Sequence, residues 1–257
     1  MDAIVLAGGR IKGALAEQEG VTAKALLRLD GRTLLERTLA ALRGSRRVER
    51  VCVVGPDEAR DVASRSGADL FVPEGKTGID NLMRGLDELG AQGRILCCAS
   101  DLPLITADDI DDLIARTPLE AQLAYVAFSR PEWQAAFPGG HSSFIPFSDG
   151  DFAGSGAFVL DAGLVRRIEP IVQKAFEMRK SAAGMAGLFG LGLALRFLLG
   201  HKVHRSLGPS TDSVRRRAEA LLGCRCAIVR GCSPSLAADV DDLDDWRYVR
   251  EEALKCA

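Results

Sequence analysis

Ala3-Ile4-Val5-Leu6-Ala7-Gly8-Gly9-Arg10 is the stretch of this sequence that decides the fold. A short apolar run enters a glycine pair, which predicts a buried strand, Ala3–Ala7, followed by a tight loop. Glycines let backbone N–H groups approach an anion because no Cβ stands in the way. Lys24 follows after a polar segment and supplies the compact positive charge that suits polyphosphate. Nucleotide chemistry is therefore the first expectation.

Working outward, strand and helix patterns alternate through the first half of the chain. The strands are expected at Ala3–Ala7, Arg50–Gly55, Asp69–Val72, Arg94–Ala99 and Gln122–Phe128, and the helices at Thr33–Leu42, Asp57–Ser66, Asn81–Leu89 and Ala107–Ala115. Several strands are almost entirely apolar, as expected where helices cover both faces of a parallel sheet. We therefore expect an α/β fold with a mostly parallel central sheet flanked by helices. In such sheets ligands bind beyond the carboxyl ends of the strands.

The second half is predicted to be less regular. Residues 130–160, rich in Pro, Gly and Ser, are expected to form irregular structure that ends in a short strand, Ala157–Leu160. We expect the rest of this half to contain a helical stretch, an apolar segment, a charged helix, a strand and an acidic end, in the order Leu164–Lys180, Ser181–Leu199, Ser213–Leu222, Arg225–Val229 and Ala238–Trp246. No linker composition divides the chain, so residues 1–257 are expected to form a single domain with a helical apolar insertion at about 164–205.

The apolar segment, residues 181–199, has three interpretations. Its uncharged part ends before Arg196, short of the roughly 20 residues that a membrane-spanning helix needs, so a spanning role is the least favoured. A buried or dimer-forming helical hairpin is favoured first. The basic residues on its two flanks, which are suited to anionic headgroups, leave a helix on a membrane surface as the second interpretation.

Bulk composition limits the classes of function. A formal net charge of −2 does not favour nucleic-acid binding, and the chain starts on a strand without the features of a signal peptide. These features predict a cytoplasmic protein, possible membrane contact being confined to the apolar segment. Cys52, Cys97 and Cys98 are expected to be buried thiols, and the spacing of Cys224, Cys226 and Cys232 matches known zinc sites poorly.

Two further acidic features accompany the glycine loop, which matches neither the P-loop nor the dinucleotide fingerprint. Asp101 follows the strand Arg94–Ala99 directly, and Pro103 fixes the turn after it. Such an aspartate is as typical of a turn or a helix N-cap as of a binding crevice. Near the other end, Asp239 or Asp241 is either part of a solvated acidic cap or joins Asp101 to hold magnesium through hard oxygen ligands.

Five short motifs occur in one order along the chain: Leu6-Ala7-Gly8-Gly9, Lys24-Ala25-Leu26-Leu27, Asp30-Gly31-Arg32-Thr33-Leu34-Leu35, Ser100-Asp101-Leu102-Pro103-Leu104-Ile105-Thr106 and Asp239-Val240-Asp241. This series resembles the nucleotidyltransferases similar to molybdenum-cofactor guanylyltransferase, a branch of the GT-A-like sugar-nucleotide synthases. The resemblance covers nearly the whole chain. It implies a Rossmann-like GT-A fold.

The resemblance also implies a site. Leu6, Ala7, Gly8, Gly9 and Arg10 would line the nucleotide, with the last three on the triphosphate. Lys24 would neutralise the triphosphate and act in catalysis with Asp101, and Asp101 with Asp241 or Asp239 would bind Mg²⁺. Gly78 and Asn81 fit the place of a loop that contacts the base, although Asn81 is equally suited to N-cap a helix Leu82–Leu89.

The implied reaction is transfer of a nucleoside monophosphate from an NTP, GTP or CTP, to a phosphorylated small-molecule or lipid-linked acceptor, with release of pyrophosphate. An anionic phosphate is already a nucleophile, which fits a chain whose three histidines lie away from these motifs in sequence. The segment between Arg10 and Lys24 and the Gly154-Ser155-Gly156 stretch depart from the family's usual pattern. A GT-A-type glycosyltransferase using a nucleotide sugar and a non-catalytic nucleotide-binding or membrane-associated protein are the alternatives.

Overall fold

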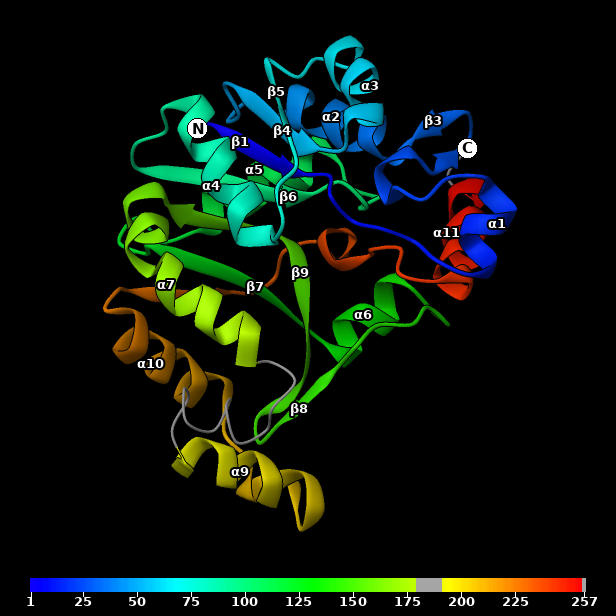
Figure 1. The fold of residues 1–257 in the computed structure, drawn as a ribbon. Coiled ribbons are helices and arrows are strands. Elements are labelled where there is room, and N and C mark those ends of the chain that lie inside the picture. Colours follow the sequence, from blue (N-terminus) through cyan, green and yellow to red (C-terminus); the bar gives the residue numbers. More distant parts are fainter. Residues whose placement is uncertain (179–190, 256–257) are drawn as a thin grey trace.

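The computed structural model describes residues 1–178 and 191–255, which form a twisted sheet with helices on both faces (Figure 1). The eight-stranded sheet has the order β10-β7-β9-β6-β1-β4-β5, and β8 pairs with β9 outside this path. Its strands are β1 Ala3–Leu6, β4 Val51–Gly55, β5 Leu70–Pro73, β6 Arg94–Ala99, β7 Leu123–Ser129, β8 Ile145–Phe147, β9 Gly150–Asp161 and β10 Cys226–Val229. A separate small hairpin joins β2 Arg28–Leu29 to β3 Arg32–Thr33.

The α-helices lie between these strands and at the end of the chain. They are α1 Ala14–Glu19, α2 Leu34–Gly44, α3 Arg60–Arg65, α4 Gly78–Leu89, α5 Ala107–Arg116, α6 Arg130–Ala136, α7 Ala162–Met178, α9 Leu191–Lys202, α10 Thr211–Leu222 and α11 Leu243–Lys255. Short 3-10 turns occur at Lys24–Leu26, Asp57–Ala59, Arg205–Leu207 and Pro234–Ala237. The expected α/β class with a mainly parallel, helix-flanked sheet is confirmed.

The apolar strands are buried on both faces, as their composition predicted. β1 pairs in parallel with β4 and β6, and its side chains alternate between two cores because successive residues of a strand point to opposite faces. Ala3 and Val5 belong to the core under α2 and α5, whereas Ile4 packs with Leu86 of α4 on the other face. Burial on both faces is why these segments read as continuous apolar runs.

The strand expected at Ala157–Leu160 is confirmed as part of β9, but the irregular structure expected before it in residues 130–160 was wrong. This stretch contains α6, β8 and most of β9, a 12-residue strand that lies antiparallel between β6 and β7. Gly154, Ser155 and Gly156 interrupt its β-type sequence, and glycine in a strand often marks a close approach of a neighbour. Here the neighbour is Tyr125, whose hydroxyl oxygen lies 1.8 Å from where a Cβ on Gly154 would stand. The glycines that hid the strand therefore have a packing cause.

Helix starts follow their capping residues. Thr33 with Glu36 and Thr106 with Asp109 both form capping boxes. The N-cap alternative for Asn81 is wrong, because α4 begins three residues earlier and Thr77 caps it, accepting a hydrogen bond from Asp80 N at 3.1 Å.

Only part of the apolar insertion lies within the described residues. The predicted helix Leu164–Lys180 corresponds to α7, and residues 191–199 of the apolar segment lie in α9, while the segment's residues 181–190 are outside the described residues. α9 packs on β8 through Phe147 and Phe197, whose ring centroids are 5.8 Å apart. Across residues 1–178 and 191–255, no helix is long and apolar enough to cross a membrane.

Candidate functional site

The glycine pair leaves β1 at its carboxyl end and the chain soon returns to it. Ile11 N donates to Thr22 O at 2.8 Å and Lys24 N donates to Gly9 O at 3.0 Å, so the segment after the glycines folds back and delivers Lys24. A Cβ on Gly9 would stand 3.1 Å from Lys24 Cδ. Glycine is therefore the residue that lets the lysine stem lie directly on this loop.

Lys24 lies between two carboxylates that come from distant parts of the chain. Its Nζ donates to Asp101 Oδ2 at 2.9 Å and also to Asp241 Oδ1. Asp101 stands just past β6, where Ser100 N continues the pairing by donating to Leu6 O at 3.3 Å. Because β1 and β6 are parallel neighbours, their carboxyl ends bring the glycine loop and Asp101 to one edge of the sheet. Lys24 and Asp101 are both buried.

The electrostatics of this cluster are dominated by negative charge. Burial works to lower the pKa of Lys24, but Asp101 and Asp241 outweigh burial and the pKa is raised, so the ammonium stays protonated. Burial raises the pKa of Asp239 to about 6, and repulsion from Asp101 and Asp241 adds to that rise. The carboxyl groups of Asp101, Asp239 and Asp241 therefore lie near one buried ammonium. This excess of negative charge favours the binding of an additional cation.

The acidic segment is fixed in place by the apolar residues within and after it. Val240 and Trp246 are fully buried in a cluster that includes Leu15 of α1. Trp246 Nε1 donates to Glu19 Oε1 at 2.9 Å, which ties α11 to α1. The segment between Arg10 and Lys24 therefore forms a platform for the C-terminal helix and holds Asp241 beside Lys24.

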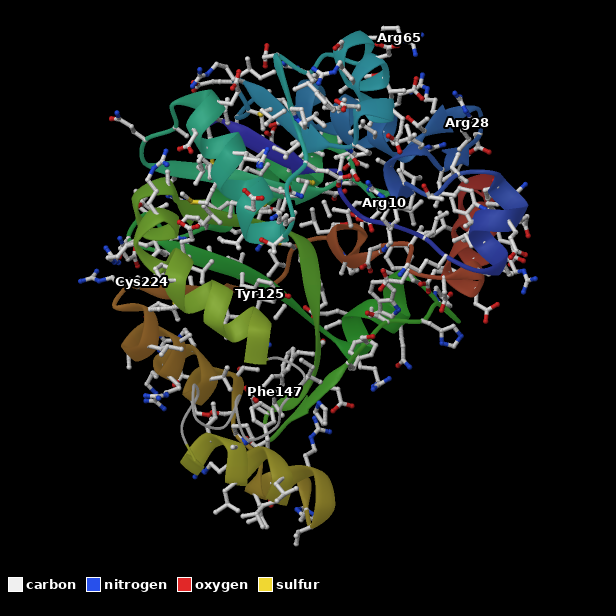
Figure 2. All side chains as sticks on the ribbon, in the orientation of Figure 1. Arg10, Arg28, Arg65, Tyr125, Phe147 and Cys224 are labelled. Atoms are coloured by element: carbon white, nitrogen blue, oxygen red, sulfur yellow. The ribbon has the colours of Figure 1, made fainter. Side chains whose placement is uncertain are left out.

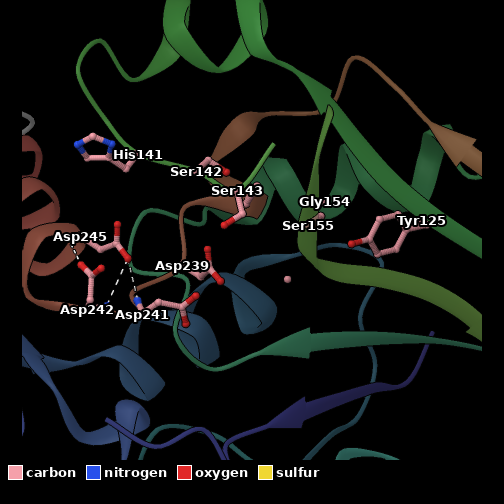
Figure 3. A pocket seen from close by; sticks show the side chains of 12 residues that line it. Tyr125, His141, Ser142, Ser143, Gly154, Ser155, Asp239, Asp241, Asp242 and Asp245 are labelled. Carbon is pink, nitrogen blue, oxygen red and sulfur yellow. Dashed lines mark hydrogen bonds between the residues drawn. The ribbon is translucent and has the colours of Figure 1, made fainter. Parts of the chain in front are cut away.

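Asp245 fixes the backbone that carries Asp241. Its Oδ2 accepts from Asp241 N at 3.0 Å and from Asp242 N at 3.3 Å (Figure 3). Asp244 and Asp245 lie in the first turn of α11, where negative charge is stabilised by the helix dipole. Asp239, Asp241, Asp242 and Asp245 all line the cavity, and Asp242 and Asp245 also hold the backbone at the start of α11.

The donor set fits a magnesium ion that takes part of its shell from substrate. Carboxylate oxygens are the hard ligands that Mg²⁺ prefers, and it is commonly held by one or two carboxylates together with substrate phosphates and waters. Asp101 and Asp241 already converge on one cation, Lys24 Nζ. Among the described residues, no group of three or more His, Cys, Asp or Glu side chains is arranged to hold a metal by itself.

The glycine-loop side of the site contains one residue that the sequence did not indicate, Glu74. It follows β5 at the carboxyl end of that strand and forms an ion pair with Arg10, whose Nη1 also donates to Gly8 O at 3.0 Å. A Cβ on Gly8 would stand 2.7 Å from Glu74 Oε2. The Pro73-Glu74-Gly75 sequence after an apolar strand carries the same positional signal that singled out Asp101.

The remaining predicted residues lie around this loop. Leu6 ends β1, and Ala7 N donates to Val54 O at 2.8 Å, so both serve the strand as well as the loop. Gly78 begins α4, and the buried Asn81 accepts from Gly75 N at 2.6 Å through Oδ1. Asn81 therefore holds the loop that carries Glu74 in place. Arg10, the ion-pair partner of Glu74, is labelled in Figure 2.

A polar cavity of about 440 Å³ opens beside the acidic segment. Figure 3 shows Asp239 and Asp241 on one side of it, Gly154 and Ser155 of β9 with Tyr125 on another, and His141 with Ser142 and Ser143 closing it. His141, Ser142 and Ser143 were not predicted. They lie in a loop, and no local sequence pattern indicates which cavity a loop will line.

A parallel sheet with a glycine loop, a lysine and paired carboxylates at the ends of its strands defines the class of NTP-using transferases of the nucleotidyltransferase type. A family model described as the MobA-like NTP transferase domain matches residues 3–174, and the chain belongs to this family. The resemblance drawn from the five motifs is thereby confirmed.

Individual relatives agree with this assignment. The chain is 39% identical over 89 residues to a phosphoenolpyruvate guanylyltransferase of Sphaerobacter thermophilus, a match that covers 34% of this chain and spans less than half, 43%, of that relative. A hypothetical transferase from Thermus thermophilus has a similar structure, with a TM-score of 0.80, 29% identity and coverage of 95% of this chain and 98% of that one. A Methanothermobacter nucleotidyl transferase, 19% identical with a TM-score of 0.58 over 100% of this chain and 98% of the other, shares the fold.

Proposed function

We propose that this protein transfers a nucleoside monophosphate from an NTP, GTP before CTP, to a phosphorylated acceptor, with Mg²⁺ as cofactor and release of pyrophosphate. The observation that carries the proposal is the cluster of Lys24, Asp101 and Asp241 directly beside Gly8 and Gly9. A phosphate loop and a carboxylate pair on one edge of the sheet are the two halves that this reaction needs.

The chemistry requires one bond to form and one to break. An oxygen of the acceptor phosphate attacks the α-phosphorus in line, and the bond to the β-phosphate oxygen breaks, so that pyrophosphate leaves with the bonding electron pair. The nucleophile is already anionic, so positioning and neutralisation of charge carry the catalysis. Lys24 and Arg10 are the cations of this chain placed to stabilise charge on the departing pyrophosphate.

Lys24 and Arg10 both have carboxylate partners in this structure, Asp101 with Asp241 and Glu74 respectively. We propose that triphosphate binding exchanges these partners, so that each cation turns from a carboxylate to a phosphate. Asp101 and Asp241 would then hold the magnesium ion, which supplies charge neutralisation at the reacting phosphate when bound.

Support for GTP comes from the relative named as a guanylyltransferase, while the family description names only an NTP. Glu74 adds a chemical reason, because a carboxylate beside the loop is an acceptor for the N1–H and N2–H₂ donors that guanine presents. The same relative's name makes phosphoenolpyruvate the first acceptor to include in an assay.

The test is a comparison of ATP, GTP, CTP and UTP, with and without Mg²⁺, by thermal shift and by pyrophosphate release in the presence of phosphorylated acceptors. A ligand that binds the folded state raises its apparent stability, so one nucleotide should give the largest shift, and Mg²⁺ should increase it. Asp101→Asn should lower turnover by roughly 10²- to 10³-fold because it removes a charge that acts at the reacting centre.

Asp61→Asn, an exposed change on α3, is the matched control and should leave turnover unchanged. Full pyrophosphate release by Asp101→Asn would contradict the assignment. Nucleotide binding without turnover on any acceptor would identify a binding protein instead, and transfer from a nucleotide sugar would identify a glycosyltransferase.

A further inference from the structure

A second cavity lies on the other side of Tyr125 from the polar one. Its volume is about 260 Å³, and its walls are mostly apolar side chains of β7, β8, β9, β10 and α10. Tyr125 and Gly154 line both cavities. The two spaces are therefore neighbours that share a wall.

Among residues 1–178 and 191–255, one face of the sheet is only partly covered, and the apolar cavity lies there. Leu123, Tyr125 and Ala127 of β7 point into it, while the alternate residues Ala124 and Val126 are fully buried in the core on the opposite face. At its rim Ile145 of β8 is 52% exposed, and Tyr125 is 45% exposed. Large apolar side chains left exposed around a hollow are typical of a binding surface.

Tyr125 is suited to a boundary between polar and apolar space. Its hydroxyl lies against Gly154 at the polar cavity, as the view in Figure 3 shows, and a Cβ at position 154 would force it away. Tyr125 also lines the apolar cavity, as does Phe147 of β8, and both residues are labelled in Figure 2. Tyrosine commonly lies at such boundaries because it has an apolar body and a polar tip.

We propose that the acceptor is an amphiphilic phosphate, which places its phosphorylated head in the polar cavity, where the magnesium ion proposed on Asp101 and Asp241 would offset the negative charge of the aspartates, and an alkyl or similar apolar chain past Tyr125 in the apolar cavity. The proposal rests on the proposed function, because it identifies the apolar cavity as part of the acceptor site. The shared wall at Tyr125 and Gly154 is the observation that joins the two halves.

The chain-length dependence of binding provides the test. Inorganic phosphate, phosphoenolpyruvate and the butyl, hexyl, octyl and decyl monophosphates are titrated calorimetrically into the protein with Mg²⁺ and a GTP analogue whose α–β bridge is a methylene and cannot be cleaved. Pyrophosphate release is measured separately with GTP and each acceptor. Affinity should increase about 3- to 4-fold for each buried methylene, the equivalent of about 0.8 kcal/mol, until the cavity is filled. Pyrophosphate release should rise along the same series.

Two neighbouring alanines of α10 supply a matched pair of variants. Ala218 lines the apolar cavity, whereas Ala220 is exposed, two positions further along the helix. Ala218→Phe should fill the cavity and abolish the dependence on chain length without changing the thermal shift caused by GTP, and Ala220→Phe should keep both. Ile145→Ser removes part of the rim from an exposed strand and should flatten the series even if Ala218→Phe does not fold.

The outcomes separate this inference from the proposed function. A flat series, or preference for phosphoenolpyruvate, with GTP still shifting the melting temperature would overturn the inference and leave the proposed function standing. Chain-length-dependent binding without any nucleotide binding would overturn both. Binding of decyl phosphate supports the inference whether the compound is free in solution or held in phosphatidylcholine vesicles. Equal binding to vesicles that lack decyl phosphate would show adsorption to the membrane and would overturn the inference.

Discussion

The Lys24 side chain is fixed by its contact with the glycine loop, by two ion pairs and by its burial. Its stem lies on Gly9, its ammonium donates to Asp101 and Asp241, and it is only 8% exposed. Burying an ammonium is costly unless it is paired, so the burial of Lys24 depends on its ion pairs with Asp101 and Asp241.

Replacing Lys24 should therefore change ligand affinity as well as the contacts of Asp101 and Asp241 in the unliganded protein. Lys24→Ala should weaken triphosphate binding by roughly 10- to 100-fold, the size expected for lost hydrogen bonds between charged groups. Monophosphate binding should weaken much less, because the lysine is placed to meet the outer phosphates. Titration calorimetry with GTP and GMP measures both affinities.

Lys12→Ala, an exposed change in the same segment, serves as the control and should leave both affinities unchanged. Equal losses for GTP and GMP in Lys24→Ala would show that the lysine merely supports the local structure.

Single residues differed in how far sequence could place them. Gly8, Gly9, Lys24 and Asp101 were predictable because each follows or faces the end of an apolar strand, and parallel strands end at one edge. Glu74 has the same position after β5 but lacked a motif, and His141 lies in a loop whose path depends on tertiary packing. Local pattern locates strand ends well and loop walls poorly.

At the scale of elements, α4 packs unusually close to the sheet. A Cβ on Gly85 would stand 2.9 Å from Ile4 Cγ2 and 3.1 Å from Val54 Cγ2. Glycine costs helix stability, yet here it lets α4 approach β1 and β4 and bring Asn81 of its first turn, and Glu74 of the loop before it, to the glycine pair.

Gly85→Ala should therefore lower the free energy of unfolding by roughly 1–3 kcal/mol, because the strain of overpacking exceeds the gain in helix propensity. Gly192 of α9 has open space around its Cβ position, so Gly192→Ala should instead raise stability by up to about 1 kcal/mol. Urea unfolding of the two variants measures this contrast, and stabilisation by Gly85→Ala would contradict the close packing.

Element prediction failed where glycine and serine concealed a strand. β9 is the longest strand of the sheet, but its central Gly154-Ser155-Gly156 weakened the β pattern that marks the other strands. The same residues line the polar cavity, where their small side chains leave space. The β pattern of the sequence is therefore weakest at the cavity wall. Capping boxes, by contrast, depend on residues three positions apart and were visible locally.

At the scale of the whole molecule, buried carboxylates link distant helices and make stability depend on pH. Asp111 of α5 accepts from Ser45 Oγ at 2.5 Å and from the Arg46 backbone and side chain, both at 3.1 Å, just after α2. The Ser45 hydroxyl chiefly lowers the pKa of Asp111; burial opposes this and Arg46 adds to it.

A lowered pKa means that Asp111 stabilises the fold fully above the ordinary aspartate pKa of about 4. This stabilisation is lost as pH falls through the lower pKa of the folded state, where the carboxylate is protonated. The difference in unfolding free energy between the wild type and Asp111→Asn should therefore be constant near neutral pH and shrink at acidic pH. Denaturant unfolding across pH measures it, with the exposed Asp108→Asn showing little difference throughout; a difference that grew on acidification would refute the ionised contact.

The bond between Lys24 and Asp241 closes a span of 217 positions along the chain. During synthesis on the ribosome, the glycine loop and its lysine emerge early, whereas the second carboxylate arrives with the tail. A nascent chain therefore presents every strand of the sheet before it presents Asp241, the second of the two carboxylates that we propose for the metal. Because Trp246 of α11 packs with Leu15 of α1 and donates to Glu19, the proposed site is complete only where α11 lies against α1.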